Sequence, residues 1–303
     1  EVSDPHKIAL RTKRLDIQRK YMESDRAVRI QYASKNAGVA NAWKKWQGGM
    51  KGINRLGTVQ AKRAYEKRFS GWAEAAGYGD VLGKLDSLYK AAEPYSFIQD
   101  YYMETAYTVE LARFARSIMS LNSKGASGEE FDAVADAFYK DYYMPIDKEC
   151  FVAVMDAFDR NVPEEFQPAY FRDMMSEYGR VAVWADALFA ESMFTDRCNR
   201  MRFTDSSAVA DDPAVVFSME FSRWYSRDIY PELSRIGREI TLLNREYMKG
   251  QMEFEPEKAF YPDANLTLRV AYGQVAGYSP ADGIYYEPYS TIDGIMEKDN
   301  PEI

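Results

Sequence analysis

Histidine is the side chain that most often moves protons in enzyme active sites, and this sequence of 303 residues contains one, His6. A Ser-His-Asp or Cys-His catalytic site within the chain would have to use it. His6 stands between Pro5 and Lys7, in the first turn of a predicted opening helix, and we interpret it as a solvated surface residue. No Gly-x-Ser-x-Gly motif presents a nucleophilic serine. We therefore predict no catalytic residue, and no complete catalytic site of the chain's own.

Metal-binding patterns are also sparse. A di-iron centre in a helical bundle needs two Glu-x-x-His motifs, and the single histidine excludes it. Two acidic pairs, Asp132/Asp136 and Asp156/Asp159, each lie on one face of a predicted helix. We interpret them as solvated faces. No Gly-x-x-x-x-Gly-Lys-[Ser/Thr] loop is present to hold a phosphate. The sequence therefore predicts no metal and no cofactor.

The charge is unevenly distributed along the chain. Residues 1–70 contain 17 Lys and Arg against 6 Asp and Glu, a net of +11, whereas the remainder contains 22 against 41, a net of −19. A basic arm can bind nucleic acid. Trp43 and Trp46 lie among these basic residues without a recognised binding motif, so we favour a basic helical pair that rests against an acidic body or another domain. We predict no nucleic-acid partner.

Hydrophobic spacing indicates a mainly α-helical chain. Asp25 or Ser24 is a candidate N-cap for a second helix in which Ile30, Ala33, Ala37 and Ala40 share one face that we expect to pack. The predicted helices are 3–48 with a joint at 22–25, 53–76, 80–92, 93–121, 127–142, 147–160, 168–176, 180–192 and 233–250. Gly48-Gly49 and Gly250 are expected to end helices, Ser127 and Glu130 to form a capping box, and Asp212-Pro213 to start a helix.

The period changes after Pro256. Leu266, Leu268, Val270 and Tyr272 alternate with smaller or polar residues, which predicts a half-buried strand. Asp282-Gly283 is a turn signal, and 284–292 is the expected returning strand. A lone hairpin is marginally stable, so we expect this tail to pack on the helices or on a larger sheet.

Two further features leave alternatives open. Cys150 and Cys198 are compatible with one disulfide or two free thiols. The 23 tyrosines could line a peptide or carbohydrate groove, although we favour ordinary packing with a polar tip. No run approaches the ~18 apolar residues that a membrane-spanning helix needs, so no membrane span is predicted.

Two stretches resemble a known family. The first is Arg-Ile-Gln-Tyr-Ala-Ser-Lys at 29–35, which continues into Ala-Asn-Ala-Trp-Lys-Lys at 40–45. The second is Tyr-Pro-Asp-Ala-Asn at 261–265, followed by Thr-Leu-Arg at 267–269, Tyr-Gly at 272–273 and Asp-Gly-Ile-Met-Glu-Lys at 293–298. In this order and at this separation, both resemble the bacterial serine dipeptidyl peptidases of the VII and XI types. The intervening helical region is compatible, so the resemblance spans nearly the whole chain.

The resemblance implies a chymotrypsin-like double β-barrel with a large helical domain inserted to cap the active-site cleft. Residues 1–255 would be the α-helical cap, and residues 256–303 an incomplete strand segment of the barrel. The family's catalytic His and Asp would lie upstream and its serine downstream, so the chain alone is expected to be inactive. The implied partners are a peptide with a free N-terminus and the rest of the catalytic domain, with a homodimer as a candidate assembly. The implied location is periplasmic or cell-surface.

One site residue is implied by the resemblance. The family uses a cap-domain asparagine near the substrate's free α-amino group, and Asn41 is the candidate because it stands in the matching Asn-Ala-Trp-Lys segment. Its carbonyl oxygen can accept a hydrogen bond from an ammonium. Since Asn41 follows Ala33 and Ala37 at steps of four, it could instead hydrogen-bond inside the bundle. The other functional hypothesis is a stand-alone helical module that binds peptide or carbohydrate without catalysis.

Overall fold

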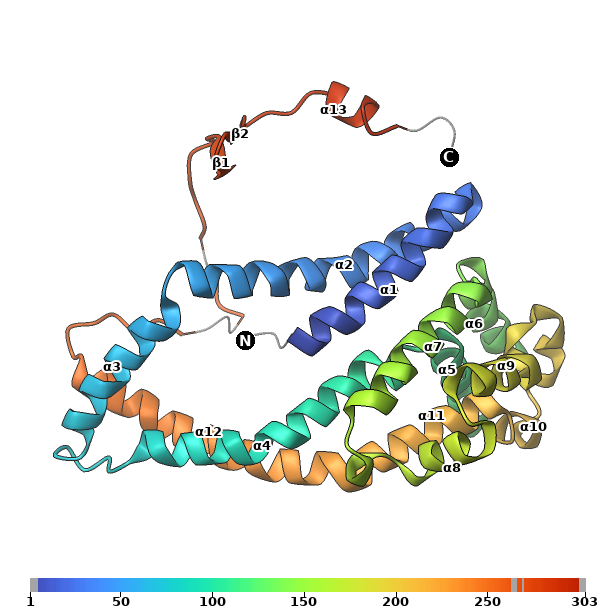
Figure 1. Ribbon diagram of the computed structural model, residues 1–303, viewed down its shortest axis with the longest axis horizontal. Coiled ribbons are helices and arrows are strands. Elements are labelled where there is room, and N and C mark those ends of the chain that lie inside the picture. The colour runs from blue at the N-terminus through green and yellow to red at the C-terminus, as the bar shows by residue number, and fades with distance from the viewer. Residues whose placement is uncertain (1–4, 263–265, 269, 300–303) are drawn as a thin grey trace. The chain divides into compact units, whose positions relative to one another are not determined.

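The computed structural model describes residues 5–262, 266–268 and 270–299, which fall into two compact units divided between Phe254 and Glu255 (Figure 1). The prediction of a mainly α-helical chain with a small C-terminal hairpin is confirmed. The assignment of roles to residues 1–255 and 256–303 stays a prediction. The helices of the first unit are α1 Pro5–Ser24, α2 Arg26–Arg55, α3 Thr58–Ala73, α4 Val81–Glu104, α5 Glu110–Lys124, α6 Gly128–Lys140, α7 Met144–Asn161, α8 Ala169–Tyr178, α9 Val181–Glu191, α10 Ser206–Ala210, α11 Pro213–Trp224 and α12 Tyr230–Phe254.

Helix starts follow the local capping chemistry that the sequence predicts. Ser127 and Glu130 form the expected capping box at α6, with the Ser127 backbone N–H donating to the Glu130 carboxylate at 2.8 Å. Asp212 caps α11 by accepting from the Ala214 N–H at 2.9 Å. Asp25, one of the two candidates, caps α2 by accepting from the Ala27 N–H at 2.7 Å.

Two predicted helix boundaries are wrong. Helix α2 passes through Gly48-Gly49 and ends only before Gly57, whose positive φ of 59° is left-handed. Helix α4 is continuous through Pro94, where a restart was expected, and the chain breaks instead at the short 3₁₀ turn Ala106–Thr108 (η1) before α5. Glycine and proline change local preferences by a few kcal/mol at most, which is an amount that tertiary packing can override.

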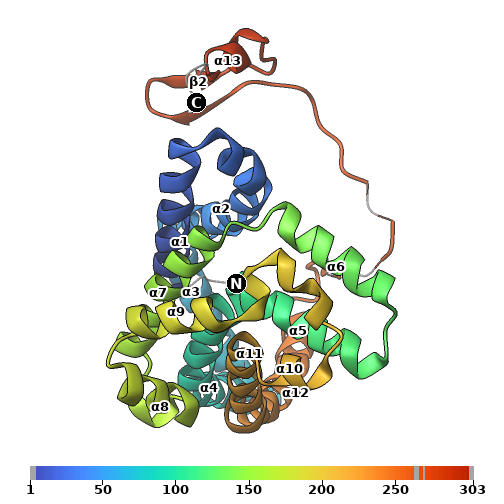
Figure 2. The same ribbon diagram turned by 90° about the vertical axis from the view of Figure 1, so that its right-hand side faces the viewer.

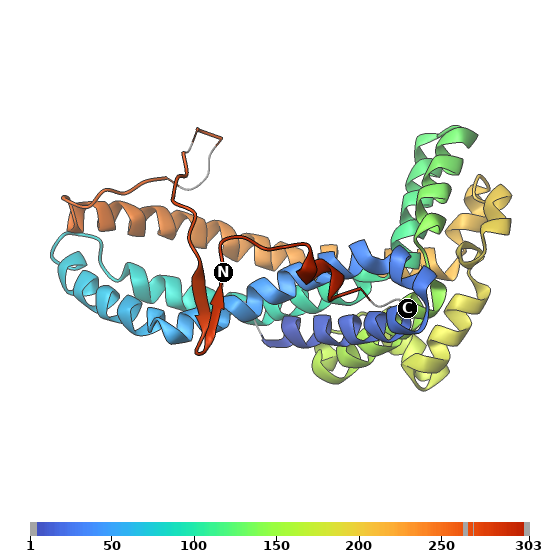
Figure 3. The same ribbon diagram turned by 90° about the horizontal axis from the view of Figure 1, so that it is seen from above.

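The helices enclose one large aromatic core, a smaller second cluster, and a third cluster between α2 and α7 that contains Val28, Tyr32, Ile146 and Cys150. The large core lies among α4, α5, α7, α9 and α11 and includes Phe151, Phe158, Trp184 and Phe217. Figure 2 shows these helices gathered beside α8 and α10. The smaller cluster joins α3, α4 and α12, with Phe69 fully buried at its centre. Helices α1 and α2 run alongside each other (Figure 3), and α1 contacts α7 and contributes Leu10 to the large core.

Gly250, which was expected to end the last helix, lies inside α12 and instead makes a close packing contact. The helix continues to Phe254, and Gly250 is buried against the Phe69 ring. A Cβ at this position would lie 2.9 Å from Phe69 Cζ and 3.2 Å from Cε2. The glycine therefore allows α12 to approach α3 closely. Gly250 does not have a positive φ, so the helix continues past it.

The second unit contains the antiparallel hairpin of β1, Tyr278–Ala281, and β2, Ile284–Tyr286, followed by α13, Asp293–Met296. The predicted turn at Asp282-Gly283 is confirmed, with Gly283 at φ 72°. The predicted strand at 266–272 is wrong for its described residues, which form no strand and are exposed. Residues 263–265 of the family-like segment lie outside the described part of the chain. Alternation alone does not make a strand, because its backbone groups need a neighbouring strand as a partner.

The Gly250 contact can be tested with a glycine pair on one helix. We expect Gly250→Ala to lower the free energy of unfolding by about 1–3 kcal/mol, because the buried Phe69 ring has no room to move away. Gly237→Ala, on the same helix with nothing within 4 Å of the added Cβ, should instead raise it by about 0.5–1 kcal/mol. Urea unfolding of both variants checks this; equal stabilisation by both would show that the close approach imposes no constraint.

Candidate functional site

Asn41, the predicted site residue, lies near the middle of α2 on its exposed side. The face that the sequence predicted to pack is also exposed: Ile30 is 70% accessible and Ala33 and Ala37 are exposed. This prediction is wrong because α2 buries the opposite side, which begins with Val28 and Tyr32. The Asn41 side chain makes no hydrogen bond to any residue that the structure describes. The alternative, in which the Asn41 side chain hydrogen-bonds inside the bundle, is therefore not observed. Substrate binding by Asn41 stays a prediction.

Helix α1 holds the part of α2 that carries Asn41. The Trp43 indole N–H donates to Thr12 Oγ1 at 2.9 Å, so Trp43 packs on α1. The Asn36 amide donates to Gln18 Oε1 at 3.1 Å, one turn before Asn41. These contacts on both sides of Asn41 fix the backbone that carries it while leaving its side chain exposed to solvent.

Arg11 adds a second anchor from α1. Its guanidinium binds Glu104 at the end of α4 in a bidentate manner, at 2.7 and 2.9 Å. The same guanidinium lies 4.3 Å from the centroid of the Trp46 ring and donates to the Val39 carbonyl at 3.4 Å. Arg11 thus joins α4, α1 and α2. Since Glu104 is 6% exposed, this pair is largely removed from water.

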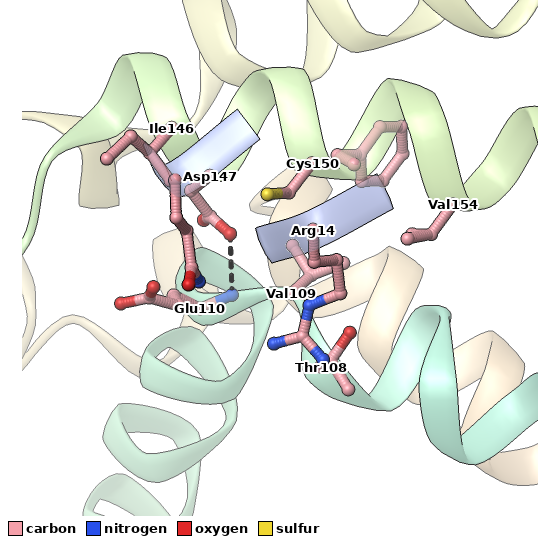
Figure 4. A pocket seen from close by; sticks show the side chains of 10 residues that line it. Arg14, Thr108, Val109, Glu110, Ile146, Asp147, Cys150 and Val154 are labelled. Carbon is pink, nitrogen blue, oxygen red and sulfur yellow. Dashed lines mark hydrogen bonds between the residues drawn. The ribbon is translucent and has the colours of Figure 1, made fainter. Parts of the chain in front are cut away.

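A buried carboxylate network holds the first half of α2 against α5. The Tyr32 hydroxyl donates to Glu110 Oε1 at 3.1 Å, and Lys35 Nζ donates to Glu110 Oε2 at 2.5 Å. Asp147, from α7, accepts from the backbone N–H groups of Glu110 and Leu111 at 2.9 and 2.8 Å. Figure 4 shows the first of these bonds beside a small cavity that has room for about one water. Helix α5 has no side-chain cap of its own at Val109, so Asp147 serves as its cap from another helix.

Burial sets the electrostatics of this network. It raises the pKa of Asp147 to about 7, reinforced by the nearby Glu110 carboxylate and opposed by the two backbone N–H donors and Lys35. Burial also raises the pKa of the Tyr32 and Tyr142 hydroxyls above their ordinary value, so both stay protonated as donors. It raises the pKa of the Cys150 thiol to about 12, which makes a thiolate nucleophile unavailable there.

The single histidine is part of a helix contact. The prediction of a solvated residue is wrong: His6 is half-buried, and its Nε2 lies 3.1 Å from Asp100 Oδ2 on α4. Its ring also stacks on Tyr101 at 5.5 Å between centroids. Burial raises the pKa of Asp100, but the hydrogen bond from His6 and the charge of Lys7 outweigh it and hold that pKa below its usual value. The side chain that His6 contacts through Nε2 is the Asp100 carboxylate. The lack of a complete catalytic site stays a prediction.

Other candidates for chemistry have structural partners. Asp132 and Asp136 pair with Arg200 and Arg197 at 3.6 and 2.6 Å. Over the described residues, no group of three or more His, Cys, Asp or Glu side chains is arranged to hold a metal ion. Cys150 and Cys198 are free thiols. None of the helices in the described part of the chain is long and apolar enough to cross a membrane.

The Asp147 cap gives a pH-dependent prediction. The pKa of about 7 in the folded state lies above the value of about 3.9 for an unfolded chain, so the group's favourable contribution is complete below pH 4 and is lost as the pH rises towards 7. We expect Asp147→Asn to lose stability relative to the wild type at pH 4, and this difference to shrink by about 1 kcal/mol or more by pH 8. Urea unfolding at several pH values measures it. Asp132→Asn, which removes an exposed ion pair, is the control. If the stability difference between Asp147→Asn and the wild type does not change with pH, the raised pKa of Asp147 is contradicted.

Comparisons with known proteins identify the family. The family model for peptidase S46 matches residues 1–302. An Asp/Glu-specific dipeptidyl-peptidase of Flavobacterium psychrophilum is 33% identical over 98% of this chain and 44% of its own length. Dipeptidyl-peptidase 7 of Porphyromonas gingivalis is 31% identical over 98% of this chain and 43% of its own length. The chain thus spans less than half the length of these relatives.

Solved structures share the fold. Porphyromonas endodontalis DPP11 in complex with the dipeptide Arg-Glu matches with a TM-score of 0.79 and 24% identity, over 98% of this chain and 45% of that one. The same protein in an alternate conformation matches with a TM-score of 0.65 over 88% of this chain. The family predicted from the two sequence stretches is confirmed: the chain belongs to the peptidase S46 family.

Proposed function

We propose that this chain is the helical cap, with the start of a returning barrel, of a serine-type dipeptidyl peptidase that releases dipeptides from peptide N-termini. The observation that carries the proposal is the extent of the family match. It covers 98% of this chain but 44% of a relative named as a dipeptidyl-peptidase. Matching structures of Porphyromonas endodontalis DPP11 are complexes with a dipeptide or with substrate, which supports peptide binding by this fold.

In this proposal, Asn41 contacts the substrate's free N-terminus. Its side chain is exposed, while Thr12 and Gln18 hold the neighbouring turns of α2 in place. A fixed amide oxygen can accept a hydrogen bond from the α-ammonium and so help to measure two residues from the end of the peptide. The rest of the parent protein would supply the serine, histidine and aspartate of the catalytic triad. A periplasmic or cell-surface location and a homodimer belong to the same proposal.

The catalytic part of the proposal is tested with a fluorophosphonate, a probe that reacts with activated serines. We expect the full-length gene product to be labelled and a protein limited to residues 1–303 to remain unlabelled, as judged by intact mass. Labelling of residues 1–303 alone would mean that this chain holds its own activated serine. Labelling of neither protein would remove the peptidase proposal and favour a non-catalytic binding module.

The role of Asn41 is tested by kinetics on the full-length protein. We expect Asn41→Ala to lower kcat/KM for a dipeptidyl substrate with a free amine by about 10- to 100-fold, the value of a hydrogen bond to a charged group. Folding should be unaffected, because Asn41 is exposed and has no hydrogen-bond partner among the described residues. Asn54→Ala, at another exposed position of α2, is the matched control. If both variants behave as the wild type, Asn41 does not bind the N-terminus.

A further inference from the structure

A cavity of about 670 Å³ lies among four helices of the first unit, α1, α2, α5 and α6. Figure 2 labels these four helices. Asn41 is not among its lining residues, so it is separate from the site proposed above. Pockets that bind small molecules usually measure about 300–1,000 Å³. This cavity therefore has room for a small ligand, and its lining indicates which kind.

Two of the cations that line the cavity are already neutralised. Arg11 forms its bidentate pair with Glu104, and Lys35 binds Glu110 and also donates to the Asp141 carbonyl. Both Glu110 carboxylate oxygens are occupied, because Tyr32 donates to the other one. On this side of the cavity the charges of Arg11 and Lys35 are therefore balanced by those of Glu104 and Glu110.

Arg14 is different, because it is largely buried and its guanidinium has no hydrogen-bond acceptor among the described residues. Its side chain is 14% exposed, and its ion pair with Glu104 is long, with Oε2 3.9 Å from Nη1. Glu104 already accepts two short bonds from Arg11. The Arg14 side chain makes no hydrogen bond to any described residue, although a guanidinium carries five donors. Figure 4 shows it reaching from α1 towards Thr108, and it lines both the small cavity there and the large one.

The remaining charges keep the cavity positive. Arg113, which is exposed, also lines it and has no ion pair with the described residues. Asp141 contributes the one carboxylate of the lining that is not paired. The lining contains four cations, Arg11, Arg14, Lys35 and Arg113, and two carboxylates, Glu110 and Asp141, so the charge stays positive even when the adjoining Glu104 is included. Gln18, which is 3% exposed, adds a buried carboxamide to the same lining. An anion in this cavity would satisfy donors that are otherwise left to water.

The opposite part of the lining is apolar. Phe114 and Phe138 stack with ring centroids 4.0 Å apart, and Val39 and Val134 lie beside the cavity. A fully hydrated inorganic anion would gain nothing from this wall, whereas an apolar group attached to the anion would gain from leaving water. The two parts together favour an organic anion over sulfate or phosphate.

We propose that this cavity binds a small organic carboxylate, whose head group pairs with Arg14 and whose apolar body lies against Phe114 and Phe138. Carboxylate and guanidinium match in a planar, two-bond geometry, which is stronger than an ordinary hydrogen bond. A free carboxylic acid and the C-terminus of a short peptide share this chemistry.

The test uses isothermal titration of the full-length protein with 3-phenylpropionate and its neutral isostere 3-phenylpropionamide at constant ionic strength. We expect the acid to bind at least about tenfold more tightly than the amide, because only the acid can pair with Arg14. Neither probe has an α-ammonium, so the result does not depend on whether the chain belongs to a working dipeptidyl peptidase. Equal binding of acid and amide, or no binding of the acid, would overturn the proposal.

Substitutions locate the binding. Arg14→Gln should weaken binding of the acid at least about tenfold, Arg14→Lys should restore part of it, and Asp141→Asn should strengthen it by removing the opposing charge. Arg19→Gln is the matched control, since Arg19 lies on the same helix with a side chain that is 60% exposed. Circular dichroism checks that each variant is folded. Unchanged affinity in a folded Arg14→Gln protein would place the ligand elsewhere and overturn the assignment.

The source of the carboxylate is distinguished with N-acetyl-Gly-Phe, whose amine is blocked. Tighter binding than 3-phenylpropionate, lost in Arg14→Gln, assigns the cavity to peptide C-termini. Weaker binding that is still lost in Arg14→Gln assigns it to free carboxylic acids. Binding that is kept in Arg14→Gln contradicts the proposal, whereas failure of fluorophosphonate labelling would leave it untouched.

Discussion

The position of α2 depends on one buried carboxylate. Asp147 closes the first turn of α5 from the neighbouring helix α7, at a point where α5 begins after a 3₁₀ turn without a cap of its own. This contact fixes Glu110, the first residue of α5, and Glu110 in turn binds Tyr32 and Lys35 of α2. The sequence of contacts runs from α7 through α5 to α2, so the cap of α5 helps to place the first half of α2, while α1 holds the part that carries Asn41.

Polar contacts rather than a broad apolar stripe attach α2 to the bundle. Only Val28 and Tyr32 are fully buried along its length, while Lys35, Asn36 and Trp43 make directed hydrogen bonds to neighbouring helices. Apolar contacts tolerate sliding and rotation, but a network of directed bonds in a low-dielectric interior loses much of its energy when geometry changes. Desolvation of the charges offsets part of their attraction, so the network contributes more to orientation than to net stability. A helix that must present one exposed side in a defined direction suits this kind of attachment.

The sequence predicted what local chemistry decides and failed where a distant residue decides. The capping box of Ser127 and Glu130 and the Asp212-Pro213 start involve residues within a single turn, and both predictions are confirmed. The packed face of α2 was wrong because Ile30, Ala33 and Ala37 carry the apolar spacing, whereas the buried side is held by polar groups that periodicity does not register. Asp147 as a cap for α5 was missed, since it follows Glu110 by 37 residues and no local motif links them. Gly250 was correctly noticed but wrongly interpreted, because its partner Phe69 is on another helix.

Arg11 and Arg14 show how the same residue type takes different roles one turn apart. Both extend from α1 towards Glu104, but that carboxylate has two oxygens and Arg11 occupies both at 2.7 and 2.9 Å. Arg14 is left 3.9 Å away, too far for a hydrogen bond, with 14% of its side chain exposed. A guanidinium cannot lose its proton to escape this environment, unlike a buried lysine or histidine. Its donors must therefore be satisfied by solvent or by a ligand within the cavity that it lines, and the apolar rings of Phe114 and Phe138 on the same cavity make an organic anion a better occupant than water alone.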